Sequence, residues 1–152
     1  VTPNRDEVTA MTGLPAGSDR ELRAAADHLH KRAVEYVWIR LGATGSLLSG
    51  PRGAVAIPTI PTQVVDVTGA GDSMLAAFCH ALLSGADPVE AARLGHAASA
   101  LTIASAHTVR PDISPALITA TLRAGHVTVP PQPVDSAPPD PSRPSAPEEI
   151  TA

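Results

Sequence analysis

Apolar residues recur along the chain at two spacings, each typical of one kind of secondary structure. In residues 19–33 they return every three or four positions, which predicts an amphipathic helix with one buried face. Residues 34–42, with the sequence VEYVWIRLG, are rich in β-branched and aromatic side chains and predict a buried strand ending at Gly42. The segments 45–50 and 53–59 predict a small hairpin.

Further helices are predicted from their first residues. Each start combines a side chain that can accept hydrogen bonds from first-turn amides with a glutamate or proline in that turn: Asn4 with Glu7, Ser18 with Glu21, Asp87 with Pro88 and Glu90, and Ser114 with Pro115. Gly125 is expected to close the last helix. Residues 73–85 are apolar nearly all round, which predicts a helix buried on most sides.

Strands separated by helices indicate an α/β layered domain with a mainly parallel sheet. Residues 1–128 contain these patterns and are expected to fold. Residues 129–152 hold many of the 16 prolines and almost no bulky apolar side chains, which predicts a disordered, proline-rich tail. The chain begins with Val1 and the strand-exit sequence VTPN, so we expect the C-terminal part of a longer protein.

Composition narrows the classes of function. A net charge of −4 without a basic run argues against binding to nucleic acid or to an anionic membrane. No apolar run approaches the ~20 residues of a membrane span. The single cysteine, Cys79, excludes an internal disulfide and fits a reducing cytoplasmic location. The histidines share no ligand spacing, so no structural zinc is expected.

The stretch DVTGAGD, residues 66–72, combines small residues with a carboxylate. VVD at 64–66 resembles a strand and the following residues a helix, and ligands of α/β proteins often bind at such junctions. Small residues let backbone amides approach an anion at a helix N-terminus. A carboxylate at Asp72 would repel a phosphate, but it suits a general base for an attacking hydroxyl. The alternative is that Asp72 caps the helix and the glycines only form the bend.

At this point the sequence resembles the ribokinase-like carbohydrate kinases, also called the phosphofructokinase-B family. Four stretches carry the resemblance, in the order that the family has them: PNRDE at 3–7, RLGATGS at 40–46, DVTGAGD at 66–72 and GHAASALTI at 95–103. The resemblance implies the C-terminal portion of a ribokinase-like three-layer α/β/α fold, with residues 1–128 forming the ATP-binding part of the kinase domain.

The family's roles carry over to matching positions. Asp72 would be the catalytic base, and the amides of Gly69, Ala70, Gly71 and Asp72 would form an anion hole for the transferred phosphoryl group. Asn4 and Glu7 would hold Mg²⁺ near the phosphates through water. The capping box remains the alternative for Asn4 and Glu7, and both roles are compatible.

Nucleotide-binding positions follow from the same resemblance: Gly42, Thr44, Gly45 and His96. Thr44 is also an ordinary turn residue. His96 stands where relatives often carry asparagine beside the adenine, and a packing role is its alternative. Asp66 and Thr68 would supply oxygens to a monovalent cation, often K⁺, unless they simply end a strand.

Residues 99–118 are similar to a stretch in pseudouridine kinases. This implies transfer of the γ-phosphate of ATP to a primary hydroxyl, with pseudouridine as acceptor. The alternatives are another ribokinase-like sugar kinase of the ribokinase or fructokinase type, a non-catalytic nucleotide-binding module, and a truncated product that never folds stably. In this family the acceptor is held mainly by N-terminal residues, so the chain alone is expected to be inactive. A homo-oligomer of the full-length protein stays open.

Overall fold

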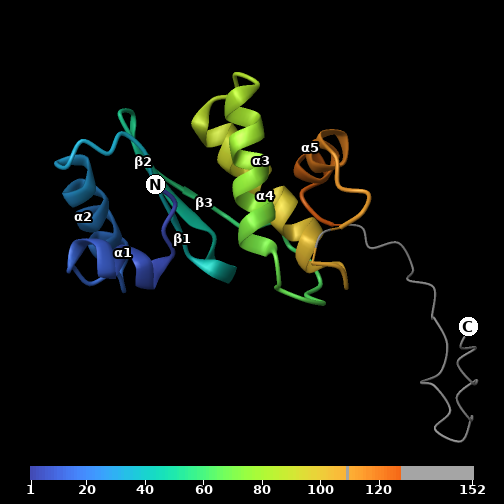
Figure 1. Ribbon diagram of the computed structural model, residues 1–152, viewed down its shortest axis with the longest axis horizontal. Coiled ribbons are helices and arrows are strands. Elements are labelled where there is room, and N and C mark those ends of the chain that lie inside the picture. Colours follow the sequence, from blue (N-terminus) through green and yellow to red (C-terminus); the bar gives the residue numbers. More distant parts are fainter. Residues whose placement is uncertain (109, 128–152) are drawn as a thin grey trace, which may run out of the picture.

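Two helices, a small sheet and three further helices follow one another along the chain in a computed structural model that describes residues 1–108 and 110–127 (Figure 1). The elements are α1 (Arg5–Thr12), α2 (Asp19–His30), β1 (Val37–Arg40), the 3₁₀ turn η1 (Gly42–Thr44), β2 (Ser46–Gly50), β3 (Gly53–Ile57), α3 (Ala70–Leu83), α4 (Pro88–Ile103) and α5 (Pro115–Ala124). The expected proline-rich tail at 129–152 lies outside the described residues.

The three strands form a meander in the order β1-β2-β3, and both pairs are antiparallel. The expectation of a mainly parallel sheet is therefore wrong for these strands. The connections explain the difference: η1 joins β1 to β2, and a two-residue turn joins β2 to β3, whereas parallel strands need a long crossover. The hairpin expected after Gly45 is confirmed.

Parallel pairing does occur beside β1, at the start of the chain. The Trp38 amide donates to the Val1 carbonyl over 2.9 Å, and the Arg40 amide donates to the Pro3 carbonyl over 2.9 Å. Asn4 and Arg40 form an isolated parallel bridge. Residues 1–4 therefore run alongside β1 and bring the first residue of the Asn4–Glu7 motif to the end of that strand.

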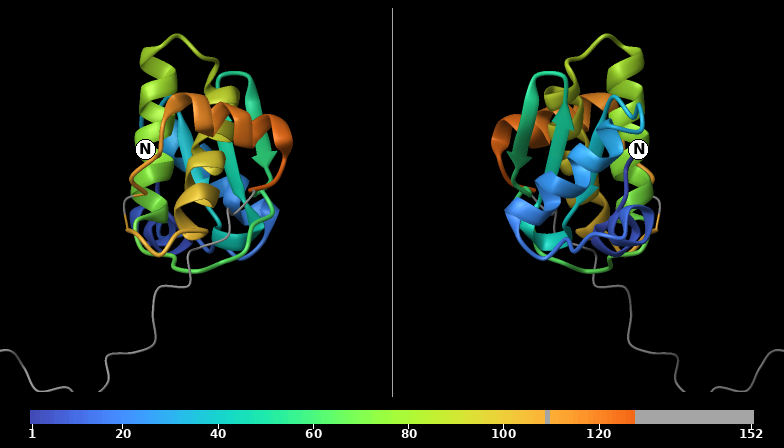
Figure 2. Two further views of the ribbon diagram at one scale, coloured as in Figure 1. Left: turned by 90° about the vertical axis from the view of Figure 1, so that its right-hand side faces the viewer. Right: turned by 90° about the vertical axis from the view of Figure 1, so that its left-hand side faces the viewer.

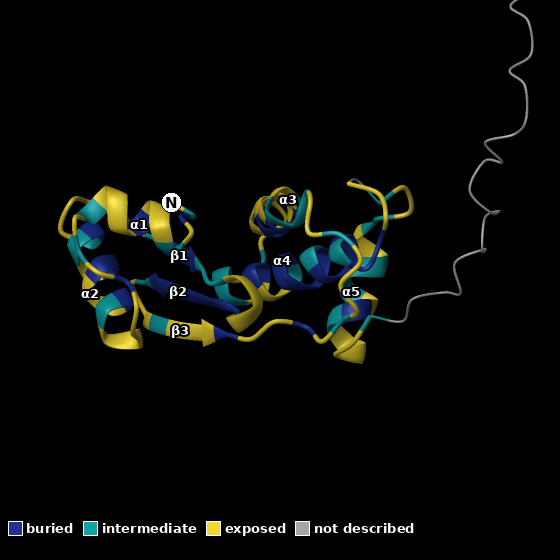
Figure 3. Ribbon diagram, turned by 90° about the horizontal axis from the view of Figure 1, so that it is seen from below, coloured by how far each residue is buried: buried dark blue, intermediate teal, exposed yellow. Residues whose placement is uncertain are grey.

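Side chains alternate between the two faces of the sheet and build two separate cores. Val37, Ile39 and Leu47 pack with buried residues of α1 and α2. Trp38 and Leu48 face the other way and pack with buried residues of α3 and α4. The result is a helix–sheet–helix arrangement, visible from below in Figure 3. The expected α/β layered architecture is confirmed.

Helices α3, α4 and α5 lie at the opposite end of the molecule from α1 and α2 (Figures 1 and 2). Ile118 and Leu122 of α5 pack against Ala97 and Ala100 of α4. Helix α3 is buried along one face only, by contrast with the expectation of burial on most sides. Its outer face exposes Leu75, Leu82 and Leu83, because no described segment covers that face.

The capping residues are observed as expected at four helix starts, with one exception. Asn4 with Glu7 and Ser18 with Glu21 form complete capping boxes. The side chains of Asp87 and Ser114 accept amide hydrogen bonds at the starts of α4 and α5, and Gly125 closes α5 in a left-handed conformation. Glu90 does not complete a capping box: its carboxylate lies 3.8 Å from the guanidinium of Arg93.

The segment VVD at 64–66 is not a strand. Val64 and Val65 are exposed, and the amides of Val65 and Asp66 both donate to the carbonyl of Ile103 at the end of α4. This anchor to a helix end replaces strand pairing, so β-branched composition alone was misleading here. No described helix is long and apolar enough to cross a membrane.

Candidate active site at the start of α3

Helix α3 begins at a sharp left-handed turn that only glycine accommodates well. Gly69 is its N-cap residue, with φ +78°. A Cβ at Gly69 would collide with the carbonyl oxygen of Thr108, from the loop after α4. The first glycine of the GAG stretch therefore serves both the backbone conformation and the close approach of two chain segments.

The first turn of α3 presents amides that have no acceptor within the described residues. The Ala70 amide donates to the Val67 carbonyl over 3.2 Å, and regular helical bonding starts with Ser73, which donates to the Gly69 carbonyl over 2.9 Å. The amides of Gly69, Gly71 and Asp72 make no hydrogen bond among the described residues. Three of the four amides expected in the anion hole are thus available, and that of Ala70 is not.

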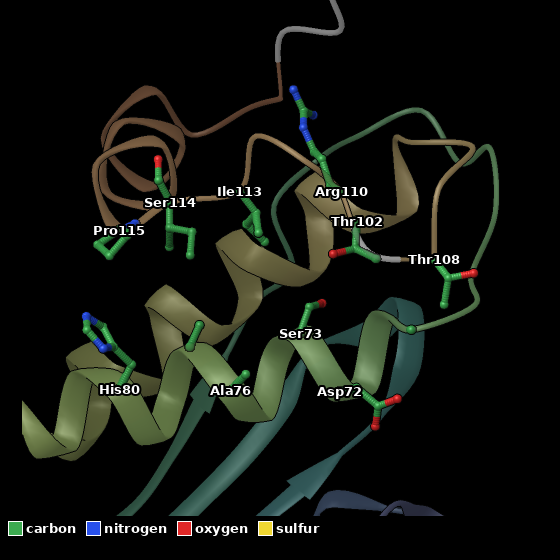
Figure 4. Close-up of a pocket in the computed structure, with 13 residues that line it drawn as sticks. Asp72, Ser73, Ala76, His80, Thr102, Thr108, Arg110, Ile113, Ser114 and Pro115 are labelled. Carbon is green, nitrogen blue, oxygen red and sulfur yellow. The ribbon is translucent and has the colours of Figure 1, made fainter.

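Asp72 lies in this first turn, with its side chain at the surface. Together with Gly69 and Thr108 it lines one end of a cavity of about 460 Å³ between α3, α4 and α5. Figure 4 shows its carboxylate pointing outward from the start of α3, away from Thr102 and Arg110 on the opposite wall. A carboxylate in this position can accept a proton from a group bound outside the helix end.

Arg110 and Asp112 form a two-pronged ion pair on the far wall of that cavity. Nε of Arg110 lies 2.5 Å from Oδ1 of Asp112, and Nη2 lies 3.0 Å from Oδ2. The hydrogen bond from Arg110 lowers the pKa of Asp112. Sequence reasoning gave this pair no role, although a basic and an acidic residue flanking Pro111 are visible in the sequence.

A second cavity, of about 360 Å³, lies between the start of α3, the turn after β1 and α4. Its walls bring together residues from all four family-like stretches: Asn4, Arg40, Gly42, Gly45, Gly71 and His96. This volume falls within the range of roughly 300–1,000 Å³ that is usual for small-molecule sites. The expected nucleotide-binding positions, except Thr44, therefore line one cavity.

Thr44 is an ordinary turn residue. Its hydroxyl donates to the carbonyl of Leu41 over 2.8 Å, and it does not line the cavity. Gly45 has φ +100°, and a Cβ there would collide with the carbonyl oxygen of Ile57. The second glycine of the loop is thus required by the packing of β3 against the turn, independently of any ligand.

His96 is a buried packing residue that also reaches the cavity wall. Its side chain packs edge-on to Trp38, and Nε2 lies 2.7 Å from Oγ of Ser46. The same hydroxyl accepts a hydrogen bond from Nε1 of Trp38 over 2.8 Å. Burial lowers the pKa of His96 to about 4, so the ring is neutral near pH 7.

Asn4 and Glu7 are committed to the capping box of α1. Oδ1 of Asn4 accepts from the Glu7 amide over 2.8 Å, and Oε2 of Glu7 accepts from the Asn4 amide over 2.6 Å. Nη2 of Arg40 lies 3.3 Å from the same Oε2. Oε1 of Glu7 is left for a water molecule. The guanidinium of Arg40 is a positive charge directly beside the expected magnesium site.

Asp66 and Thr68 form a local turn. Oδ1 of Asp66 accepts from the amide of Thr68 over 2.9 Å and from its hydroxyl over 2.8 Å. These hydrogen bonds lower the pKa of Asp66. Among residues 1–108 and 110–127, no group of three or more histidine, cysteine or acidic side chains is arranged to hold a metal ion.

Comparisons with known proteins point to one family. Residues 1–114 match the pfkB family of carbohydrate kinases. The chain is 35% identical over 115 residues to 1-phosphofructokinase of Haloferax volcanii, covering 76% of this chain and 38% of that protein. It is 36% identical over 107 residues to ribokinase of Arabidopsis thaliana, covering 68% of this chain and 28% of that protein.

A solved structure of Arabidopsis thaliana ribokinase, complexed with ribose and ATP, superposes with a TM-score of 0.74 at 30% identity. The superposition covers 80% of this chain and 40% of the ribokinase chain. The expected ribokinase-like fold is therefore confirmed for the described part. The chain spans well under half of the length of the relatives that it matches.

Proposed function

Because this chain belongs to the pfkB family of carbohydrate kinases, we propose that it forms the ATP-binding part of a kinase that phosphorylates a primary hydroxyl. The acceptor class is a sugar or a nucleoside. One observation carries the proposal: the free amide of Gly71 borders a cavity that also receives the turn after β1, and the free amide of Asp72 follows it in the same first turn of α3. That arrangement suits a nucleotide whose phosphates end at the start of α3.

In this proposal Asp72 accepts the proton of the acceptor hydroxyl as the hydroxyl oxygen attacks the γ-phosphorus of ATP. The bond from that phosphorus to the β–γ bridging oxygen breaks, and ADP leaves with the oxygen. The amides of Gly69, Gly71 and Asp72 stabilise the negative charge on the transferred phosphoryl oxygens. Positioning dominates phosphoryl transfer, since the effective molarity of aligned groups reaches roughly 10⁵–10⁸ M. The rigid start of α3, held by the contact of Gly69 with Thr108, supplies part of that alignment.

The proposed Mg²⁺ site uses Asn4 and Glu7 through water. Bound Mg²⁺ would neutralise charge on the phosphates and help to orient them. The fit is indirect, because one carboxylate oxygen of Glu7 already serves the capping box and Arg40. For K⁺, we propose the turn at Asp66 and Thr68. Oδ1 of Asp66 is already engaged, so backbone carbonyls of the turn would contribute to that site.

The acceptor is a separate proposal. Similarity of residues 99–118 to pseudouridine kinases favours pseudouridine, whereas relatives are named 1-phosphofructokinase and ribokinase. Because the chain spans 38% of the former, we propose that another portion of the kinase holds the acceptor. The isolated 152-residue chain then binds nucleotide but transfers phosphate slowly, if at all. We also propose a cytoplasmic location and an oligomeric full-length protein.

The experiment measures ADP release from ATP with pseudouridine, ribose or fructose 6-phosphate as acceptor. Both the 152-residue chain and a version carrying the acceptor-binding portion are assayed. We expect turnover in the longer version, with pseudouridine as the best acceptor, and little turnover in the chain alone. Robust turnover by the chain alone would contradict the proposal that another portion of the kinase holds the acceptor. A longer version that binds ADP but phosphorylates no acceptor would indicate a nucleotide-binding module instead.

A further inference from the structure

The cavity of about 460 Å³ between α3, α4 and α5 (the α3–α5 cavity) is separate from the cavity proposed for the nucleotide. Among the described residues, the two cavities have no lining residue in common. The nucleotide cavity is lined by Ala70, Gly71 and Met74 of α3. The α3 residues that line the α3–α5 cavity are Gly69, Asp72, Ser73, Ala76, Ala77 and His80. At about 3.6 residues per turn these two sets lie on different faces of the helix, so both cavities can be occupied at once.

Small side chains on α3 leave the α3–α5 cavity unfilled. Ser73 and Ala76 stand three residues apart on one face of the helix, whereas the bulky Met74 and Phe78 face the core shared with the sheet. Helix α5 packs on α4 through Ile118, and the space between α3 and α5 stays open (Figure 4). Its volume lies within the roughly 300–1,000 Å³ that is usual for small-molecule sites.

The lining of the α3–α5 cavity favours a neutral, mostly apolar molecule. The guanidinium of Arg110 is engaged by the carboxylate of Asp112, and Figure 4 shows it directed away from Ser73. Asp72 brings a negative charge to one end, which disfavours an anionic ligand, and His80 lies at the surface of the other end. The apolar lining residues are Ala76, Ala77, Ile113, Pro115 and Ile118.

Two hydroxyl groups face the α3–α5 cavity, that of Ser73 from α3 and that of Thr102 from α4 (Figure 4). Ser73 donates its hydroxyl hydrogen to the carbonyl of Ala70 over 3.0 Å. Thr102 donates its own to the carbonyl of Ala98, also over 3.0 Å. Because a hydroxyl has one hydrogen, both oxygens can only accept a further bond, and neither accepts one from a described residue. Thr102 is 1% exposed, so its oxygen needs a donor that enters the cavity.

We propose that the α3–α5 cavity binds a neutral aromatic molecule with one ring N–H or O–H donor, of the indole or phenol type. The ring fills the apolar space, and its donor pairs with Oγ1 of Thr102. Such molecules combine a large apolar surface with a single polar group, which matches apolar walls that carry only acceptors. The site goes beyond the proposed function, because it shares no described residue with the nucleotide cavity.

The test titrates the 152-residue chain with indole and with benzofuran, which has nearly the same shape but an oxygen in place of the ring N–H. Binding is followed through the backbone amide resonances of the chain. We expect saturable shifts at residues that line the α3–α5 cavity, with indole binding roughly 3- to 10-fold more tightly than benzofuran, as for one neutral hydrogen bond. Saturating ADP should leave the affinity for indole unchanged.

Two variants locate the site. Thr102→Val keeps the shape of the side chain and removes its oxygen, so indole should bind as weakly as benzofuran. Its matched control is Thr9→Val on α1, where the hydroxyl donates in the same way to the carbonyl of Arg5. Ala76→Phe should fill the cavity and abolish binding of both probes, whereas Ala24→Phe, at an exposed position of α2, should not.

The outcomes keep this inference distinct from the proposed function. Absence of saturable shifts with indole, or shifts confined to residues outside the α3–α5 cavity, would overturn the inference. Equal affinities for indole and benzofuran in the wild-type chain would also overturn it, whether or not Thr102→Val folds. A chain that binds indole in this cavity but does not bind ADP would contradict the proposed function and support the inference.

Discussion

At the scale of single residues, the hydrogen-bonded row Trp38–Ser46–His96 explains why a histidine is tolerated inside the protein. Ser46 joins the indole and the imidazole with hydrogen bonds of 2.8 Å and 2.7 Å. His96 is 3% exposed, so a charged ring would lose hydration without gaining a carboxylate partner. The protein therefore holds this histidine in its neutral form, and that preference links folding to pH.

The stability of the protein should fall in mild acid because of His96. Its pKa is lowered to about 4 in the folded state from an ordinary value of 6.5, so the unfolded chain binds the proton more readily. The stabilisation is complete above about pH 6.5 and is lost as the pH falls towards 4. The free energy of unfolding should fall by about 3 kcal/mol over this range, at about 1.4 kcal/mol per pKa unit.

Urea unfolding followed by fluorescence of the single tryptophan, Trp38, measures this effect. The free energy of unfolding of wild type should decrease between pH 7 and pH 4.5. His96→Asn should flatten that decrease, whereas His80→Asn, at an exposed position on α3, should not. An unchanged pH dependence in His96→Asn would show that other groups set it.

At the scale of elements, the start of α3 depends on a glycine for two separable reasons. Gly69 and Gly85 flank the same helix and both have positive φ, +78° and +84°. A Cβ at Gly85 meets nothing within 4 Å, whereas one at Gly69 collides with the Thr108 carbonyl. The pair therefore distinguishes the cost of the backbone conformation from the cost of the close contact.

We expect Gly85→Ala to cost about 1–2 kcal/mol, from the left-handed conformation alone. Gly69→Ala should cost about 2–5 kcal/mol, because displacement of the 104–108 loop adds the penalty of overpacking. Thermal unfolding of both variants provides the comparison. Similar losses would mean that the loop yields without strain, and that the Gly69–Thr108 contact does not fix the start of α3.

Most elements could be predicted from the sequence because their signals are local. Capping pairs such as Ser18 with Glu21 and the periodic apolar face of α2 depend only on residues close in sequence. The strand at 64–66 was wrongly predicted, since its amides pair with a distant helix end. For β1, β2 and β3 the expected parallel pairing was also wrong, because periodicity identifies a strand without giving the direction of its neighbour.

The sequence predicted which residues meet at the candidate site better than it predicted the contacts that they make there. Gly42, Gly45, Gly71 and His96 meet around one cavity, as their motifs suggested. The Ala70 amide is engaged locally, by the Val67 carbonyl three residues earlier, but no sequence pattern marks that turn. The place of Arg40 is a tertiary feature. Alternation along β1 indicated only which face Arg40 shares, and its proximity to Gly71 follows from how α3 packs on the sheet.

At the scale of the whole molecule, the sheet separates two cores and carries one side of the site. The α1–α2 layer positions the Asn4–Glu7 motif at one end of β1, while the α3–α4 layer brings the free amides to the same end. The exposed leucines of α3 lie on the outer face of the second layer. This layout supports a nucleotide site that is largely preformed in the present chain.

The measurement that tests the central claim most directly is phosphoryl transfer by Asp72→Asn in a version carrying the acceptor-binding portion. ADP release and ADP affinity are both measured. The matched control is Glu90→Gln, since Glu90 and Asp72 occupy equivalent first-turn positions of α4 and α3. We predict that Asp72→Asn lowers kcat by roughly 10²–10⁴-fold with ADP affinity retained, and that the control behaves as wild type. Wild-type turnover in Asp72→Asn would contradict the account.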